Sequence, residues 1–314
     1  MDLFVGSFSI RIVLLGTLQR VAAVLWRRAR RWAALLLLGL CLPLYAAPLR
    51  VNVLLSEAGG SYSELAGALR DALDAGAFTL TIGTSAAPPE STDLYVAVGM
   101  KASLAVSHST RPVLSVWTPR ATVDAIKRPA FSALYMEQPI ARHWALLRAA
   151  LPEVRAVGVL YATLPMELPG LRRLARADGL VLHEQVVTEP AQLGANLAEL
   201  IGKSDVLLAL PDAAIYRRDT IRNILLQTYR QRVPLIGISR NYVQAGALCS
   251  VYSSPVQVAH QAAGAIEYFA ANGHLPASQY PQEFEVSVNT QVARSLGLTI
   301  KDAAQLRAAI GWGG

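Results

Sequence analysis

Polar residues follow several short apolar runs of this sequence, at positions where a small molecule could be held. The sharpest of them is Asp212, which closes the run V-L-L-A-L that begins at Val206. Its carboxylate could accept a hydrogen bond from a ligand ammonium or hydroxyl group. It could equally cap the helix that follows, and both roles remain open.

Glycine and aromatic residues end other apolar runs. Ser56 with the pair Gly59-Gly60 could offer backbone N–H groups to a carboxylate, although a turn that feeds a helix explains them equally well. Aromatic rings at such ends could stack on a planar ligand, although aromatics more often serve packing. The residues predicted to contact a ligand are Ser56, Gly60, Ser61, Gly99, Met100, Trp117, Tyr135, Tyr161, Asp212, Ser239, Tyr252 and Ser253.

Signals for catalysis or metal binding are poor. The segment from Gly237 to Asn241 begins like a nucleophile elbow but lacks the closing glycine. Cys249 lies in an apolar run, where an inert buried thiol is usual. The histidines at 108, 143, 183, 260 and 274 show no metal-ligand spacing. We therefore predict no catalytic residue, no metal and no cofactor.

Strand and helix signals alternate along the chain, which predicts an α/β protein with mostly parallel strands. A first unit of five strands is predicted at 49–55, 78–82, 94–98, 113–117 and 131–135, with helices at 63–75, 101–107 and 119–127. A second unit has strands at 156–161, 180–187, 206–210, 235–238 and 248–252, with helices at 140–151, 220–232 and 256–271. Because ligands bind beyond the carboxyl ends of parallel strands, two facing units predict a cleft between them.

Several segments, taken in their order along the chain, resemble those of one protein family. They are E-Q-P-I-A-R from Glu137, R-A-V-G-V-L-Y from Arg155, S-D-V-L-L-A-L-P-D from Ser204, V-P-L-I-G-I-S from Val233 and E-F-E-V-S-V-N-T-Q-V-A-R-S-L-G-L-T-I from Glu283. Their order resembles the substrate-binding proteins of ABC transporters, in the group of tryptophan/tyrosine-type periplasmic binding proteins. In that comparison Asp212 matches an acidic ligand contact. The first loop and V-Y-S-S-P from Val251 depart from the family pattern.

The resemblance implies a two-lobed, type I periplasmic binding fold in which the chain crosses three times between the lobes. The crossings are expected near 135–138, 252–254 and 283–288. Residues 48–138 and 254–285 would form the N-terminal lobe, and 139–253 with 286–314 the C-terminal lobe.

The first 47 residues predict an export signal or an N-terminal anchor. The cluster R-R-A-R-R from Arg27 precedes an apolar core of about fourteen residues and a small-residue end at Ala46 and Ala47. That core is shorter than the ~20 residues of a membrane span. Cys41 would permit a lipoprotein, but Leu40 stands where a small residue is needed.

Most of the net positive charge of the chain comes from this segment. Six of the 29 basic and one of the 22 acidic residues lie in 1–47, which leaves 23 and 21 beyond Ala47. A nearly neutral remainder argues against a nucleic-acid partner. One cysteine remains there, so no internal disulfide is expected.

We therefore predict a monomeric periplasmic protein that closes over a small molecule and presents it to a membrane permease. The resemblance suggests an aromatic amino acid or a similar small organic solute. One alternative is a sensory or accessory protein that reports to a membrane sensor or outer-membrane receptor. An α/β enzyme is the third possibility.

Overall fold

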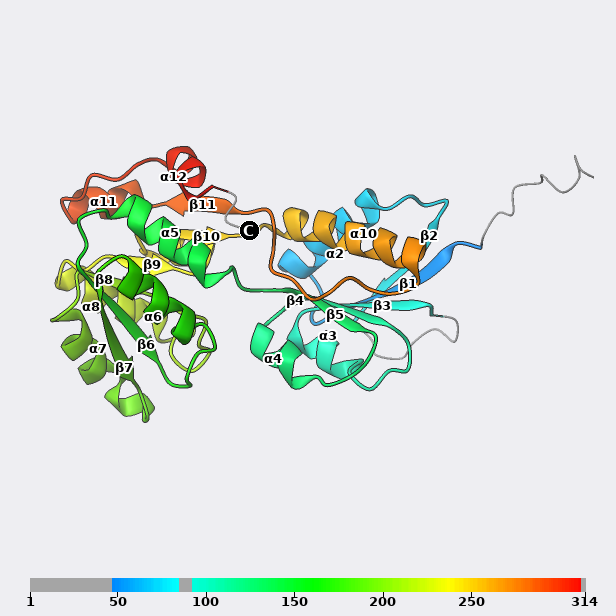
Figure 1. Cartoon of the computed structure of the whole chain (residues 1–314), viewed down its shortest axis with the longest axis horizontal. Helices are drawn as coiled ribbons and strands as arrows, with labels where there is room; N and C mark the ends of the chain where they lie inside the picture. The colour runs from blue at the N-terminus through cyan, green and yellow to red at the C-terminus, as the bar shows by residue number, and fades with distance from the viewer. Residues whose placement is uncertain (1–46, 85–91, 312–314) are drawn as a thin grey trace, which may run out of the picture. The chain divides into compact units, whose positions relative to one another are not determined.

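Two β-sheets organise the part of the chain that the computed structural model describes, residues 47–84 and 92–311 (Figure 1). The signal or anchor predicted at 1–47 lies outside these residues except for Ala47, so it stays a prediction.

The first sheet is entirely parallel, in the order β2-β1-β3-β4-β5. With the helices packed on it, it forms what we call the first lobe. Its strands are β1 (Leu49–Leu55), β2 (Phe78–Gly83), β3 (Leu94–Val98), β4 (Val113–Thr118) and β5 (Phe131–Tyr135). Its helices are α2 (Gly60–Ala72), α3 (Met100–Ala105), α4 (Arg120–Ala125) and α10 (Pro255–Asn272).

The second sheet has the order β11-β10-β9-β8-β6-β7, and only β11 is antiparallel to its neighbour. It forms the second lobe with its own helices. Its strands are β6 (Ala156–Tyr161), β7 (Val181–Val186), β8 (Val206–Leu208), β9 (Leu235–Gly237), β10 (Cys249–Tyr252) and β11 (Glu285–Val288). Its helices are α5 (Ile140–Ala150), α6 (Leu168–Ala177), η1 (Pro190–Gln192, a 3-10 helix), α7 (Leu193–Ile201), α8 (Ile221–Arg230), α9 (Arg240–Ala245), α11 (Thr290–Ser295) and α12 (Ala303–Ile310).

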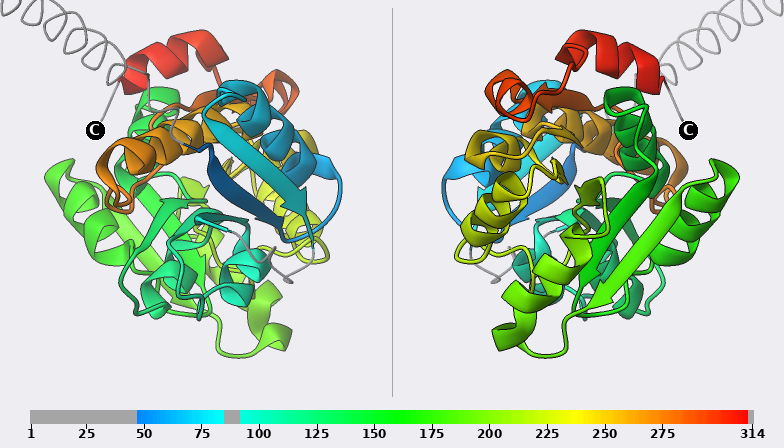
Figure 2. Two further views of the ribbon diagram at one scale, coloured as in Figure 1. Left: turned by 90° about the vertical axis from the view of Figure 1, so that its right-hand side faces the viewer. Right: turned by 90° about the vertical axis from the view of Figure 1, so that its left-hand side faces the viewer.

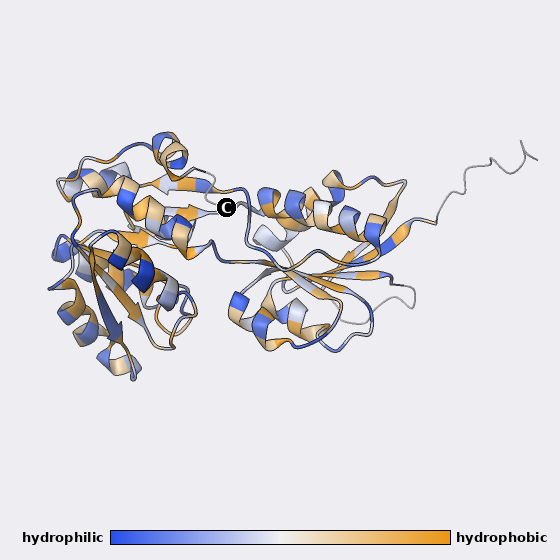
Figure 3. Cartoon of the chain, viewed as in Figure 1, coloured by the Kyte–Doolittle hydropathy of each residue, from blue (hydrophilic) through white to orange (hydrophobic). Residues whose placement is uncertain are grey.

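Helices cover both faces of each sheet, and because successive strand residues point to opposite faces, the inner strands bury side chains on both sides. In β1, Val53 packs with α2 and α10, whereas its neighbour Leu54 packs on the other face with Ala102 of α3. Figure 2 shows α10, in orange, on the same side of the first sheet as α2. The inner strands are accordingly mostly apolar, as Figure 3 shows in orange, whereas the edge strand β7 (V-L-H-E-Q-V) carries polar residues.

The second sheet follows the same rule. Val159 of β6 packs toward α5, α6 and α12, and Leu160 packs toward α7 and α8. The run that begins at Val206 forms β8, which lies between β9 and β6 in the parallel part of the sheet.

Several predicted element ends were wrong by a few residues. Helix α2 begins at Gly60 rather than Ser63, because Gly59 adopts a φ of 87° that turns the chain into the helix. Strand β8 ends at Leu208 rather than Leu210. The prediction also assigned no helix to 168–177, 193–201, 240–245, 290–295 or 303–310, which form α6, α7, α9, α11 and α12.

The chain passes between the two sheets three times. The first passage joins β5 to α5, and the second joins β10 to α10. The third begins at Gln279, which exchanges backbone hydrogen bonds with Ala133 and Tyr135 at the edge of β5, and it ends in β11. It therefore starts before Glu283, where sequence reasoning placed it. The predicted boundaries of the lobes stay a prediction.

Candidate functional site

A pocket of about 970 Å³ lies where the three passages meet the carboxyl ends of β4, β9 and β10. Both lobes contribute to its wall. The lining residues are Ser61, Glu64, Trp117, Met136, Glu137, Gln138, His143, Pro211, Ile238, Ser239, Arg240, Asn241, Tyr252, Ser253, Ser254, Pro255, Val256, Gln257, His260, Glu283 and Glu285.

Five of the residues predicted from the sequence line this pocket: Ser61, Trp117, Ser239, Tyr252 and Ser253. They come from α2, from the ends of β4, β9 and β10, and from the second passage. The strand-end rule thus brings together residues that are far apart in the sequence.

Trp117 is the most unusual residue of the pocket wall. Its φ is 59°, in the left-handed region, where a bulky side chain costs roughly 1–2 kcal/mol. The strain arises at a β-bulge, because Val116 pairs with Leu134 and Thr118 with Tyr135, which leaves Trp117 without a partner in the register. The half-buried indole lies edge-on to the Tyr62 ring, with 6.1 Å between ring centroids.

Four predicted residues of the first lobe lie outside the pocket lining. Ser56 is buried, and its Oγ accepts a hydrogen bond from Ala102 N at 3.0 Å. Gly99 has a φ of 89°, and a Cβ there would stand 2.5 Å from Ser56 Oγ, so this glycine is explained by packing. Gly60 starts α2 and Met100 starts α3.

The two remaining tyrosines also lie outside the pocket lining. Tyr135 is buried and packs against Tyr280, with ring centroids 5.0 Å apart. The Tyr161 hydroxyl donates to Glu184 Oε2 at 3.1 Å, and burial raises the pKa of this tyrosine. Both side chains serve packing within their lobes.

Asp212 is engaged by the backbone. Its Oδ2 accepts from Ala162 N at 2.7 Å and Thr163 N at 3.2 Å, and its Oδ1 accepts from Ala214 N at 2.8 Å and Ile215 N at 3.2 Å. The carboxylate therefore ties the end of β6 to the turn after β8. It caps this turn rather than α8, whose N-cap is Thr220. Only its neighbour Pro211 lines the pocket.

A chain of hydrogen bonds joins the three passages beneath the pocket. Gln138 Nε2 donates to Ser253 Oγ at 2.8 Å, and Ser253 Oγ donates to the Glu283 carbonyl. Arg142 donates to Gln138 Oε1 and, at 2.9 Å, to the Pro281 carbonyl, while its guanidinium lies 4.4 Å from the centre of the Phe284 ring. We call Gln138, Arg142, Ser253 and Glu283 the hinge clamp.

Four glutamates of the pocket were missed by the sequence analysis: Glu64, Glu137, Glu283 and Glu285. Glu137 accepts from Arg120 N with both oxygens, at 3.1 and 3.0 Å, and burial raises its pKa. Glu285 Oε2 accepts from the Tyr252 hydroxyl at 3.0 Å. The alternation in E-F-E, which puts Glu283 and Glu285 on one face around buried Phe284, is a signal that could have shown two of them.

His143 is the most buried titratable side chain of the wall, with 3% of its surface exposed. Burial, together with the charge of Arg142, lowers its pKa to about 4. Its Nδ1 has no hydrogen-bond partner. The imidazole is therefore neutral at pH 7 and keeps unused hydrogen-bonding capacity.

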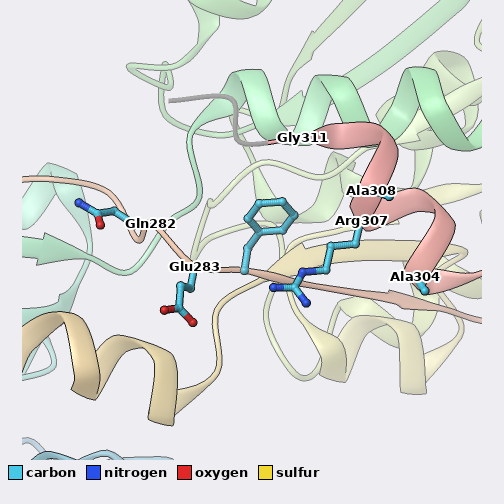
Figure 4. Close-up of a pocket in the computed structure, with 7 residues that line it drawn as sticks. Gln282, Glu283, Ala304, Arg307, Ala308 and Gly311 are labelled. Atoms are coloured by element: carbon cyan, nitrogen blue, oxygen red, sulfur yellow. The ribbon is translucent and has the colours of Figure 1, made fainter. Parts of the chain in front are cut away.

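A smaller hollow of about 400 Å³ lies where the third passage meets α12 (Figure 4). Arg307 of α12 and Glu283 border it, with Gln282, Phe284, Ala304, Ala308 and Gly311. Glu283 thus borders both hollows.

The described residues hold no cluster of three or more histidine, cysteine or acidic side chains that could bind a metal ion. Cys249 is fully buried in β10, and burial raises the pKa of its thiol. Among residues 47–84 and 92–311, no helix combines the length and apolarity needed to cross a bilayer.

The sequence pattern described as ABC transporter substrate binding protein matches residues 92–310. The chain belongs to this family. The proteins of the family are binding proteins rather than enzymes, are typically periplasmic or exported, and bind small ligands. No curated protein matches this chain.

Solved structures share the fold of this substrate-binding protein. A conserved domain protein from Vibrio cholerae is 19% identical, with a TM-score of 0.59, over 84% of this chain and 98% of the other. An ABC domain from Streptococcus pneumoniae in complex with L-Trp is 16% identical, with a TM-score of 0.60, over 83% and 98%. The ligand-free, open CD0873 substrate-binding protein from Clostridium difficile is 15% identical, with a TM-score of 0.65, over 81% and 96%.

Replacement of Asp212 tests its role in this substrate-binding protein. Asp212→Ala leaves four backbone N–H groups without their acceptor, so we expect a loss of about 1–3 kcal/mol in the free energy of unfolding. Asp212→Asn keeps one oxygen and should lose less. Urea denaturation measures both. A ligand affinity lost in Asp212→Asn at unchanged stability would contradict this assignment.

The buried imidazole of His143 should make the free energy of unfolding depend on pH. Its folded pKa of about 4 lies below the ordinary value of 6.5, so the unfolded chain binds more protons between these values. Stability should therefore fall as the pH drops from 6.5 to 4, by on the order of 3 kcal/mol. Urea denaturation of the wild type and of His143→Phe across this range measures it. Equal pH slopes in the two proteins would contradict the prediction.

Proposed function

We propose that this chain is the solute-binding component of an ABC-type uptake system, exported by residues 1–47. It binds a small organic solute in the pocket between its lobes and presents it to a membrane permease. The ligand class that the side chains favour is a small solute with a planar ring and an ammonium group, such as an aromatic amino acid or a related amine. Ring, ammonium and carboxylate would each find a partner there.

The observation that carries this proposal is the strained Trp117. Backbone strain of this kind persists where the surroundings impose it, and it concentrates at ligand-binding positions. Here the strained residue holds an indole in the wall of the 970 Å³ pocket. Tyr252 lines the same pocket from the second lobe, so a planar ring could contact both.

The charged groups of the pocket fit the polar ends of such a solute. Arg240, at the start of α9, could pair with a carboxylate, and the pocket glutamates could accept from an ammonium group. The Streptococcus structure is a complex with L-Trp. At 16% identity that likeness speaks for the fold, so the ligand proposal rests on these side chains.

Native mass spectrometry of the protein purified from its own periplasm tests the proposed function. We expect a co-purifying small organic molecule whose mass names its class, and an N-terminus at Ala47 or Pro48. A full-length form retained in the inner membrane would contradict export. Protein that carries no solute and binds none from a periplasmic extract would contradict the binding function.

Two substitutions of Trp117 separate its strain from its ligand contact. Trp117→Ala and Trp117→Gly both remove the ring, so each should lower affinity for the co-purified solute at least ten-fold. The glycine variant should be about 1 kcal/mol more stable than the alanine variant, because glycine accepts a positive φ without steric cost. Calorimetry and urea denaturation measure the two effects. Wild-type affinity in both variants would contradict a ligand contact.

A further inference from the structure

The pocket wall carries a strong excess of negative charge. It contains four carboxylates, Glu64, Glu137, Glu283 and Glu285, and one guanidinium, that of Arg240. The other titratable groups of the wall are His143, which is neutral, Tyr252 and His260. A proton on His260 would still leave an excess of negative charge.

Two further guanidinium groups lie close to the wall, because the charge of Arg120 acts on Glu137 and Arg142 bonds to Gln138, but neither forms an ion pair with a pocket glutamate. The described residues of the chain form six ion pairs, and their acidic partners are Asp93, Asp124, Asp178, Glu184, Glu199 and Asp219. None of these lines the pocket. Glu137 and Glu285, which are half-buried, receive hydrogen bonds from neutral groups, whereas the side chains of Glu64 and Glu283 are exposed and receive none from the described residues. Carboxylates left without a counter-charge in a hollow favour a positively charged occupant.

His143 is a buried polar side chain of the wall. It is 97% buried, lines the pocket and has an Nδ1 without a partner. A buried polar atom without a partner is costly unless a ligand or a water satisfies it. A neutral imidazole has one N–H donor and one lone pair, so a ligand that reaches this side chain could donate to it or accept from it.

The apolar part of the wall fits the rest of such a molecule. Trp117 and Tyr252 present aromatic rings, whose faces attract cations as well as planar groups. Met136 and Val256 add exposed apolar surface beside them. Carboxylates, a neutral imidazole and aromatic rings together describe a site for an amine.

We propose that the pocket selects a net-cationic aromatic amine over the corresponding zwitterionic amino acid, with the ammonium group at the glutamates and the ring against Trp117 and Tyr252. This inference rests on the proposed function, because it names the class of solute that the same pocket binds. The carboxylate of an amino acid would find only Arg240, in a wall that otherwise repels it.

Calorimetry with three ligands that share one ring tests the proposal. They are tryptamine, which is cationic, tryptophan, which is zwitterionic, and indole-3-propionate, which is anionic. We expect tryptamine to bind at least ten-fold more tightly than tryptophan, and indole-3-propionate to bind most weakly. The preference for tryptamine should shrink as salt is added, because part of it is electrostatic.

Three variants test which carboxylates produce the preference for a cationic ligand. Glu64→Gln and Glu285→Gln should each weaken tryptamine binding several-fold. Each should also reduce the ratio of the tryptamine affinity to the tryptophan affinity. Glu153→Gln, an exposed site after α5, removes the same charge outside the pocket and should bind tryptamine as the wild type does. Melting temperatures of all three variants confirm that each is folded.

Tryptophan binding as tightly as tryptamine, or full tryptamine affinity in both pocket variants, would overturn the cation preference and leave the proposed solute-binding function standing. Absence of binding by all three ligands would also overturn it. The proposed function fails separately, if the protein carries no solute from its own periplasm and binds none from a periplasmic extract.

Discussion

The hinge clamp is the interaction on which the site depends. Its hydrogen bonds run from Gln138 in the first passage through Ser253 in the second to the Glu283 carbonyl in the third. Arg142, which is 6% exposed, donates to Gln138 in the first passage and to the Pro281 carbonyl in the third. Because Gln138, Ser253 and Glu283 also line the pocket, the contacts that join the passages shape the ligand site as well. A ligand there would act directly on the segments through which the lobes are connected.

The two lobes share one arrangement of strands, and this decides where the pocket is. In each sheet the strand order reverses beside the first strand, between β1 and β3 or between β6 and β8. Such points are common ligand sites, but here the protein fills both with its own side chains, Ser56 and Asp212. The free space lies instead at the ends of β4, β9 and β10, next to the passages. The charged and aromatic groups of the site are therefore those of the passages and their neighbours.

The sequence predicted the layers of this fold because burial on both faces leaves apolar runs that are easy to recognise. It predicted Trp117, Ser239, Tyr252 and Ser253 in the pocket wall because strand ends meet at one edge of a sheet. It could not show that the Asp212 carboxylate is used by four backbone N–H groups, since Ala162 lies fifty residues away. The positive φ of Trp117 depends on a bulge that only the pairing of β4 with β5 reveals. Glu64 was missed because a glutamate on a helix is ordinarily a solvated residue.

We propose that a ligand in this pocket contacts both lobes and thereby favours a closed arrangement of them, as a shift between two populations. Small-angle X-ray scattering with and without saturating co-purified ligand measures this most directly. We expect a smaller radius of gyration when the ligand is bound, and a smaller change in Trp117→Ala at the same ligand concentration, because fewer molecules of the variant are occupied. An unchanged radius for the wild type at full occupancy would contradict closure over the pocket.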